Sequence, residues 1–157
     1  MTISTLCNRA VVTIHRQATV EDAARLMRSN HIGDVVVVDA ADARVPVGIL
    51  TDRDIVVEVI APGRAAAQTS VGSIMTSPVL TLREDDGLMQ ALDKMSQRGV
   101  RRAPVVDRDG RLRGLISVDD LVRLLARELA KVGALIMHGR DAEIRKTEIS
   151  RVDEYAT

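Results

Sequence analysis

Two short stretches of the sequence carry residue types that bind phosphate and sugar groups. Residues 48–54 read GILTDRD and residues 114–120 read GLISVDD, so in both a glycine precedes two aliphatic residues, a hydroxyl residue and, three positions later, an aspartate. At the start of a helix the free backbone amides and the helix dipole attract phosphate, and a hydroxyl group adds a donor. A carboxylate accepts hydrogen bonds from the two hydroxyls of a ribose. Together these groups suit a nucleotide.

The same residues also have a purely structural interpretation. Thr51 with Asp54, and Ser117 with Asp120, satisfy the capping box, in which the hydroxyl and the acid each accept a hydrogen bond from a backbone amide at the start of a helix. Capping boxes are common at helix starts, so this interpretation stays open. It does not explain the glycine of each stretch, since glycine inside a strand lowers stability unless another group approaches the backbone closely.

The composition restricts the classes of function. The chain has 157 residues, about the length of one domain, and its 22 basic side chains balance 22 acidic ones. Without a global positive field, binding of nucleic acid or of a membrane surface is not expected. The chain has no Phe, no Trp and a single Tyr, so aromatic stacking cannot hold a base. Val, Ile and Pro side chains would have to enclose it.

Several other functions lack a motif. The sequence has no run of about 18 apolar residues, no targeting segment and one cysteine, Cys7, so we expect a soluble, cytoplasmic protein. His15, His31 and His138 do not have the spacing of metal ligands, and no metal site is expected. No nucleophile elbow, phosphate loop or catalytic triad is recognisable, so we do not expect an enzyme.

The chain contains an internal repeat. Residues 3–39 align with residues 71–107 at an offset of 68, which pairs, for example, Cys7 with Met75. The offset becomes 66 after a loop that is two residues longer in the first copy. A repeat of this length indicates a duplicated supersecondary unit whose halves pack on one another. Such halves usually associate about a pseudo-two-fold axis, which creates two related clefts.

Each copy shows the pattern strand, helix, strand, strand, helix. The helix that follows the first short strand has apolar residues at helical spacing, and Thr19 with Asp22 forms its capping box. The continuous apolar runs that begin at Val35 and Ala103 indicate strands covered on both faces. The residues expected on the buried faces of the two helices are Val20, Ala23, Ala24 and Met27 in the first copy and Leu88, Ala91, Leu92 and Met95 in the second.

The order of these elements resembles a tandem pair of cystathionine β-synthase (CBS) domains, also called a Bateman module. The resemblance covers about residues 3–130 and is carried by STLCNRAVVTI and VGSIMTSPVLTL, by VVVVD and APVVD, and by the two Gly-aliphatic-aliphatic-Thr/Ser-x-x-Asp elements. Each motif is short, but the same order of motifs occurs twice with matching spacing, and this repetition makes the resemblance specific. The resemblance implies a flat module whose clefts often bind AMP, ADP, ATP, NAD or S-adenosylmethionine as regulatory ligands. It implies no obligatory cofactor.

The resemblance also implies a set of binding residues. Asp54 and Asp120 would bind ribose, and Thr51 and Ser117 would lie near ribose or phosphate. From its place in the TDRD stretch, and not from the resemblance, Arg53 is expected to reach the phosphates in the central cleft. The base would lie against backbone and apolar side chains on the opening and central strands. The residues nominated there are Val12, Asp34, Val35, Pro78, Val79, Ala103 and Pro104.

The two copies differ in the cations available to a phosphate. Arg101 and Arg102 precede the central strand of the second copy, whereas Asp34 stands at the position matching Arg102. A guanidinium group can grip phosphate bidentately. We therefore expect the stronger nucleotide site to combine Ser117, Asp120 and one of the two arginines. A solvated strand edge is the alternative interpretation of these arginines.

The predicted fold is α/β (α+β): two tandem CBS-type β-α-β-β-α repeats about a pseudo-two-fold axis, with an extended C-terminal helical segment. The boundaries expected are 1–62 for the first repeat, 63–70 for the connection, 71–130 for the second repeat and 131–157 for the extension. Gly133 and Gly139 are expected to weaken or end the last helix, with a possible short helix after it and a frayed end. Its long apolar stripe would be covered in a homodimer, or else within one chain.

Two functional hypotheses of different classes follow. The first is a stand-alone sensor that binds an adenosine-containing ligand between the repeats and transmits binding to an unknown regulated protein or through an oligomer. The alternative is a ligand-free scaffold that only presents a dimer or partner surface. Asp34, and the replacement of Arg53 by Asp119 at the matching position, keep the second hypothesis open.

Overall fold

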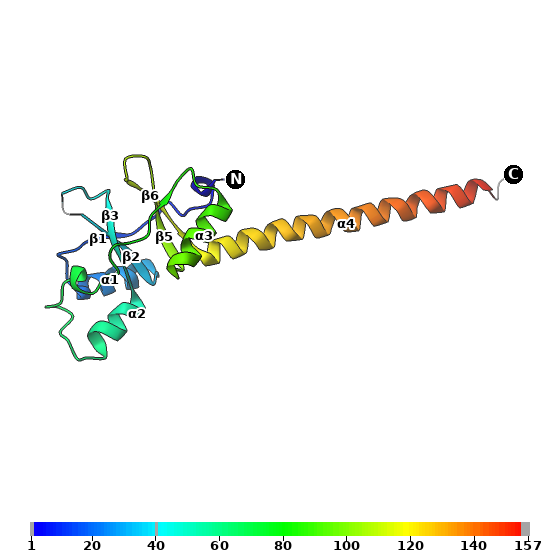
Figure 1. Cartoon of the computed structure of the whole chain (residues 1–157). Coiled ribbons are helices and arrows are strands. Elements are labelled where there is room, and N and C mark those ends of the chain that lie inside the picture. Colours follow the sequence, from blue (N-terminus) through cyan, green and yellow to red (C-terminus); the bar gives the residue numbers. More distant parts are fainter. Residues whose placement is uncertain (1, 40, 155–157) are drawn as a thin grey trace. The chain divides into compact units, whose positions relative to one another are not determined.

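The computed structural model describes the backbone of residues 2–39 and 41–154, and the side chains of residues 2–39 and 41–140. The chain divides into two compact units after Val118. The first unit begins with a short 3-10 helix η1 (Ile3–Thr5), and the second consists of helix α4 (Val118–Glu154) from Asp119 onward (Figure 1). Between them lie β1 (Thr13–His15), α1 (Val20–Asn30), β2 (Asp34–Val38), β3 (Pro46–Thr51), α2 (Asp52–Ile55), a π-helical turn η2 (Val56–Ile60), η3 (Val71–Ser73), β4 (Leu82–Arg83), α3 (Leu88–Arg98), β5 (Arg102–Val106) and β6 (Leu112–Ser117).

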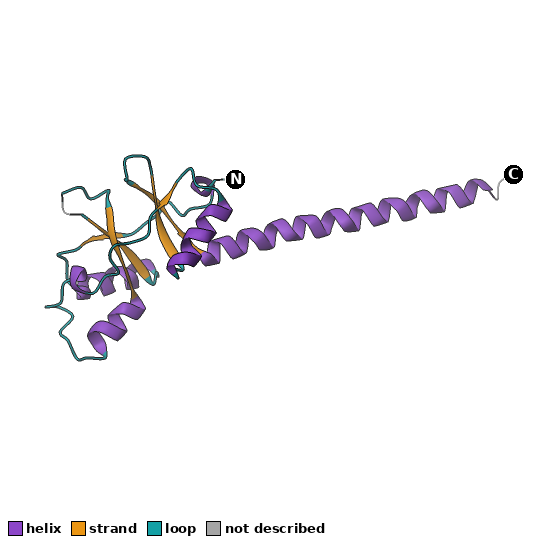
Figure 2. Cartoon of the chain, viewed as in Figure 1, coloured by secondary structure: helices purple, strands orange, loops and turns teal. Residues whose placement is uncertain are grey.

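The repeat appears as two three-stranded sheets, ordered β1-β2-β3 and β4-β5-β6 (Figure 2). In each sheet the first pair is parallel and the second antiparallel. The registers match as well, because Asp34 pairs with Thr51 in the first sheet and Arg102 pairs with Ser117 in the second. Both antiparallel pairs also have an irregularity near the end of the central strand. The predicted strand, helix, strand, strand, helix order is confirmed.

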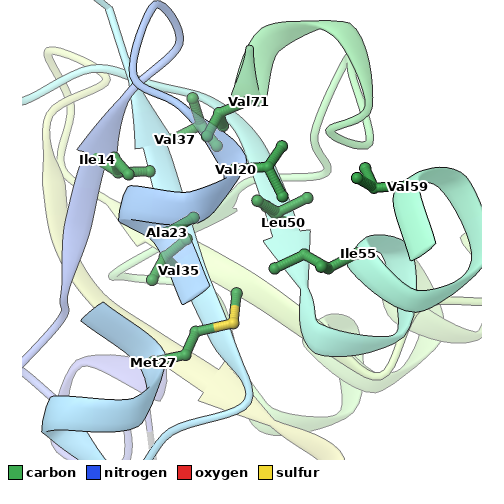
Figure 3. Packing of buried hydrophobic residues seen from close by; sticks show 10 residues of the cluster. All are labelled: Ile14, Val20, Ala23, Met27, Val35, Val37, Leu50, Ile55, Val59 and Val71. Carbon is green, nitrogen blue, oxygen red and sulfur yellow. The ribbon is translucent and has the colours of Figure 1, made fainter. Parts of the chain in front are cut away.

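The central strands are buried as the continuous apolar runs predicted. Val35 to Val38 of β2 are each at most 1% exposed, and the core of the first repeat lies between its sheet, α1 and the α2–η2 segment (Figure 3). Helix α1 starts with the expected capping box of Thr19 and Asp22. Val20, Ala23 and Met27 are buried, but Ala24 is exposed, so its prediction was wrong. The buried face of this helix is narrower than the apolar stripe, and alanine adds little apolar area to bury.

The two repeats exchange their opening segments. Asn8, which precedes β1, exchanges backbone hydrogen bonds of 2.8 and 2.9 Å with Leu115 of β6 in the other repeat. Thr76, which precedes β4, likewise exchanges bonds of 2.9 and 3.3 Å with Ile49 of β3. Each sheet therefore has an edge completed by the chain that leads into the other repeat.

This exchange explains the glycine of each Gly-x-x-Thr/Ser-x-x-Asp element. A Cβ atom added to Gly114 would lie 2.6 Å from the Cys7 Sγ and 2.9 Å from the Asn8 carbonyl oxygen. A Cβ added to Gly48 would lie 2.5 Å from the Met75 Sδ. The opening segments thus occupy the space beside Gly48 and Gly114 that a side chain at either position would need. Burial raises the pKa of the Cys7 thiol, as a packing role for this residue implies.

Replacing Gly114 with Ala is expected to lower the free energy of unfolding by about 1–3 kcal/mol, because the new methyl group overpacks a short side chain and a bonded carbonyl. Gly48→Ala should cost less, since Met75 is long and flexible and can move aside. Urea denaturation followed by circular dichroism measures both values. Equal losses in the two variants would contradict the role assigned to Cys7 and Asn8.

The C-terminal segment is one continuous helix, so the expectation that Gly133 or Gly139 ends it was wrong. Helix α4 runs through both glycines to Glu154, with no separate second helix. One glycine costs about 1 kcal/mol relative to Ala, which the surrounding Leu, Ala, Lys, Arg and Glu residues offset by their high helix propensity. The expected frayed end falls in residues 155–157, which lie outside the described residues. Leu121 and Leu124 of α4 are buried.

Candidate ligand-binding cleft

A cleft of about 410 Å³ lies at the end of the first Gly-x-x-Thr-x-x-Asp element. This volume falls within the range of small-molecule sites in proteins. The wall combines the end of β3 and the start of α2 with the segment that leads into β5, so both repeats contribute to it. The lining residues are Ile49, Thr51, Asp52, Arg53, Asp54, Thr76, Val100, Arg101 and Arg102.

Thr51 and Asp54 form the predicted capping box. The Asp54 Oδ2 accepts from the Thr51 backbone amide at 2.9 Å and from the Thr51 hydroxyl at 2.7 Å, and the hydroxyl oxygen accepts from the Asp54 amide at 3.2 Å. Both bonds to the carboxylate end on the same oxygen, Oδ2. The other oxygen, Oδ1, accepts no hydrogen bond from the described part of the chain. The box therefore leaves a carboxylate oxygen for a second role.

Arg101 and Arg102 line this first cleft, although the sequence grouped them with Ser117 and Asp120. Arg102 is the sheet partner of Ser117, as expected from its position, but the packing of the repeats also brings it beside Thr51 and Asp54. Arg53, nominated for a central cleft, lines the same wall. Three arginines thus line the same cleft as the capping box.

Asp34 and Arg102, which occupy matching positions in the two repeats, form an ion pair with each other. The Arg102 Nε lies 3.1 Å from the Asp34 Oδ1, and the two side chains are 37% and 11% exposed. Burial, reinforced by the charge of Asp52 and opposed by that of Arg102, raises the pKa of Asp34. The sequence showed a charge reversal between the copies. The structure shows that the reversed charges meet.

The apolar residues nominated to frame the base do not line the cleft of the described chain. Val35, Ala103 and Pro104 are buried within their sheets, and Val12 packs against the first core. Pro78 is exposed after a cis peptide bond, and Val79 is half-buried. Ile49, Asp52, Thr76 and Val100 line the cleft but were not nominated. Ile49 and Asp52 lie inside the recognised element, whereas no local pattern marked Thr76 or Val100.

The second element is split by the boundary between the two units. Ser117 is the last residue of β6 and is half-buried. Asp120 lies in the first turn of α4, where its Oδ1 is 3.7 Å from the Arg123 Nη1. The expectation of a stronger site at this element stays a prediction.

Two further expectations concern metals and membranes. Within the described residues, no three His, Cys, Asp or Glu side chains are grouped so that they could hold a metal ion. None of the described helices combines the length and the apolar character needed to cross a membrane.

Comparisons with known proteins agree on one family. The CBS domain model matches residues 3–61 and 71–127. An uncharacterized protein of Methanopyrus kandleri is 33% identical over 124 residues, a match that covers 79% of this chain and 62% of that protein. This chain thus spans about three fifths of that relative.

Two solved structures share the fold and contain ligands. A CBS domain protein of Pyrobaculum aerophilum complexed with AMP has a TM-score of 0.73 and 28% identity, over 83% of this chain and 99% of that one. The CBS domain pair of protein MJ0100, in complex with 5′-methylthioadenosine and S-adenosyl-L-methionine, has a TM-score of 0.71 and 26% identity, over 82% of this chain and 98% of that one.

Proposed function

The chain belongs to the CBS domain family, and from that membership we propose that it is a regulatory module that binds an adenosine-containing ligand in the cleft beside Thr51 and Asp54. The observation that carries the proposal is that one cleft is lined both by Asp54, whose Oδ1 accepts no hydrogen bond from the described residues, and by three arginines. A carboxylate suits the ribose hydroxyls, and guanidinium groups suit a phosphate. Relatives complexed with AMP and with S-adenosyl-L-methionine support this ligand class.

The charges of the cleft favour a ligand of low net charge. Asp52 and Asp54 line it together with the three arginines, and Arg102 is already paired with Asp34. The formal charges of these six side chains sum to zero, so no net positive charge remains to attract a polyphosphate. We therefore expect AMP to bind more tightly than ATP, with NAD and S-adenosylmethionine as further candidates.

The proposal extends to the biological role. Ligand binding would be read by a regulated protein or through a homodimer, and the module itself would be regulatory, not catalytic. We place it in the reducing cytoplasm, because its one cysteine, Cys7, has a packing role against Gly114.

A thermal unfolding screen with AMP, ADP, ATP, NAD and S-adenosylmethionine tests the proposal. Ligand at about 100 times its dissociation constant should stabilise the protein by about 2.7 kcal/mol, which raises Tm by about 5–10 °C for a protein of this size. The signal should be circular dichroism or calorimetry, because the chain has no Trp and only one Tyr. No shift with any of the five compounds would contradict the proposed function.

A ligand-free scaffold is the second candidate, and the Asp34–Arg102 ion pair favours it. An arginine held at 3.1 Å by a largely buried aspartate is less available to a ligand. Light scattering with and without AMP separates the two candidates, since a scaffold keeps the same mass and radius.

A further inference from the structure

Helix α4 presents a seam of exposed apolar side chains along its described residues. The large apolar side chains of the seam are well exposed, and the highest exposed fractions among them are 70% for Leu129 and 69% for Ile136. They recur at alternating intervals of three and four residues, the spacing that places side chains along the contact line of two paired helices. The seam spans about 27 Å at 1.5 Å per residue. Its members are Val122, Leu125, Leu129, Val132, Ile136 and Gly139.

We propose that α4 pairs with α4 of a second copy of this chain in antiparallel orientation, centred between Ala130 and Lys131. This proposal rests on the homodimer named in the proposed function and identifies the helix surface that would form it. The pairing of the two helices would not require a ligand.

The sizes of the seam residues fit the antiparallel orientation. With this centre, Leu125 of one helix faces Ile136 of the other, and Leu129 faces Val132. Val122 faces Gly139, where a side chain has open space, since nothing lies within 4 Å of an added Cβ. In the parallel orientation each residue faces its own copy. Gly139 would then face Gly139 and leave a gap in the seam.

The charges beside the seam also fit this orientation. In the antiparallel register Asp119 of one copy, which also interacts within its own chain, lies opposite Arg140 of the other, and the two-fold symmetry makes this pair twice. Both side chains are exposed. Ala126 lies opposite Gly133, so small residues let the helices approach closely between the charged pairs.

The first test is the mass of the full-length protein by analytical ultracentrifugation. The wild-type chain should be a dimer at micromolar concentration, and Leu129→Ser should raise the dimer dissociation constant at least about 100-fold, because it removes a large side chain from each central layer. Met137→Ser is the matched control, since Met137 is 64% exposed but lies outside the seam. A monomeric wild type, or a dimer unaffected by Leu129→Ser, would overturn the proposal.

The second test is the orientation of the helices. In a Cys7→Ser background, a Leu125→Cys chain mixed with an Ile136→Cys chain should form a disulfide-linked heterodimer in oxidised glutathione. Leu125→Cys alone should not link to itself, because its copies lie apart in the antiparallel register. Self-linking of Leu125→Cys would overturn the antiparallel arrangement. AMP stabilisation measured on Leu129→Ser separates the two proposals, since it should persist in a monomer whose cleft is intact.

Discussion

The variant Asp54→Ala is expected to lose the stabilisation that AMP gives to the wild-type protein. Hydrogen bonds to a charged group contribute about 1.5–3 kcal/mol each, and each 1.4 kcal/mol is tenfold in affinity. Removal of the carboxylate that is proposed to bind the ribose should therefore weaken AMP binding at least about 100-fold. Isothermal titration calorimetry and the AMP-dependent shift of Tm both measure this loss.

Asp54→Ala also removes a helix cap, and the chain offers a matched control for that effect. Asp22 closes the same capping box with Thr19, with bonds of 2.6, 3.1 and 3.3 Å, but it does not line the cleft. Asp22→Ala should lower stability in the same way, because it also removes a helix cap, while AMP affinity stays at the wild-type value. If Asp54→Ala binds AMP as well as Asp22→Ala does, the carboxylate is only a cap.

The variant Arg102→Met should be the least stable single substitution at the ion pair. It leaves the Asp34 carboxylate, whose side chain is 11% exposed, without its cation. Breaking a buried pair typically costs about 3–5 kcal/mol, and since Arg102 is partly exposed we expect about 2 kcal/mol here. The double variant Asp34→Asn/Arg102→Met should recover most of this loss, which urea denaturation of the four chains measures.

The loss in Arg102→Met should depend on pH in a defined direction. Burial and Asp52 raise the pKa of Asp34, and Arg102 opposes them, so removal of Arg102 raises this pKa further. A folded-state pKa above the unfolded value of about 3.9 means that stability falls as pH rises through the range between the two values. Arg102→Met should therefore regain stability on acidification from neutral pH toward that range, relative to the double variant. A pH-independent difference between the two chains would refute the assignment to Asp34.

Local patterns in the sequence predicted the features that depend on neighbouring residues. The capping boxes of Thr19 and Thr51 need residues only three positions apart, and the buried run of β2 is visible in five letters. The glycine at position 114 indicated that some group approaches the backbone, but only the fold identifies Cys7 and Asn8.

Features that depend on packing between the repeats could not be predicted in this way. In sequence, Arg102 precedes a strand that pairs with the Ser117 strand, so it was grouped with that element. Its contact with Asp34 arises because matching strand ends of the two repeats lie together. Thr76 reaches the cleft because its segment crosses to the other sheet, and no residue near it in the sequence signals that crossing.

The exchange of opening segments has a consequence for how the protein unfolds. A fragment that ends in the connection at 63–70 would lack Thr76 at the edge of its sheet, and its own Asn8 would have no Leu115 to bond. The two halves are therefore interdependent in folding, and unfolding should be a single cooperative event despite the duplicated architecture. Thr76 both pairs with Ile49 at the edge of the first sheet and lines the cleft. An AMP molecule bound there would therefore stabilise the contact through which the second repeat supports the first.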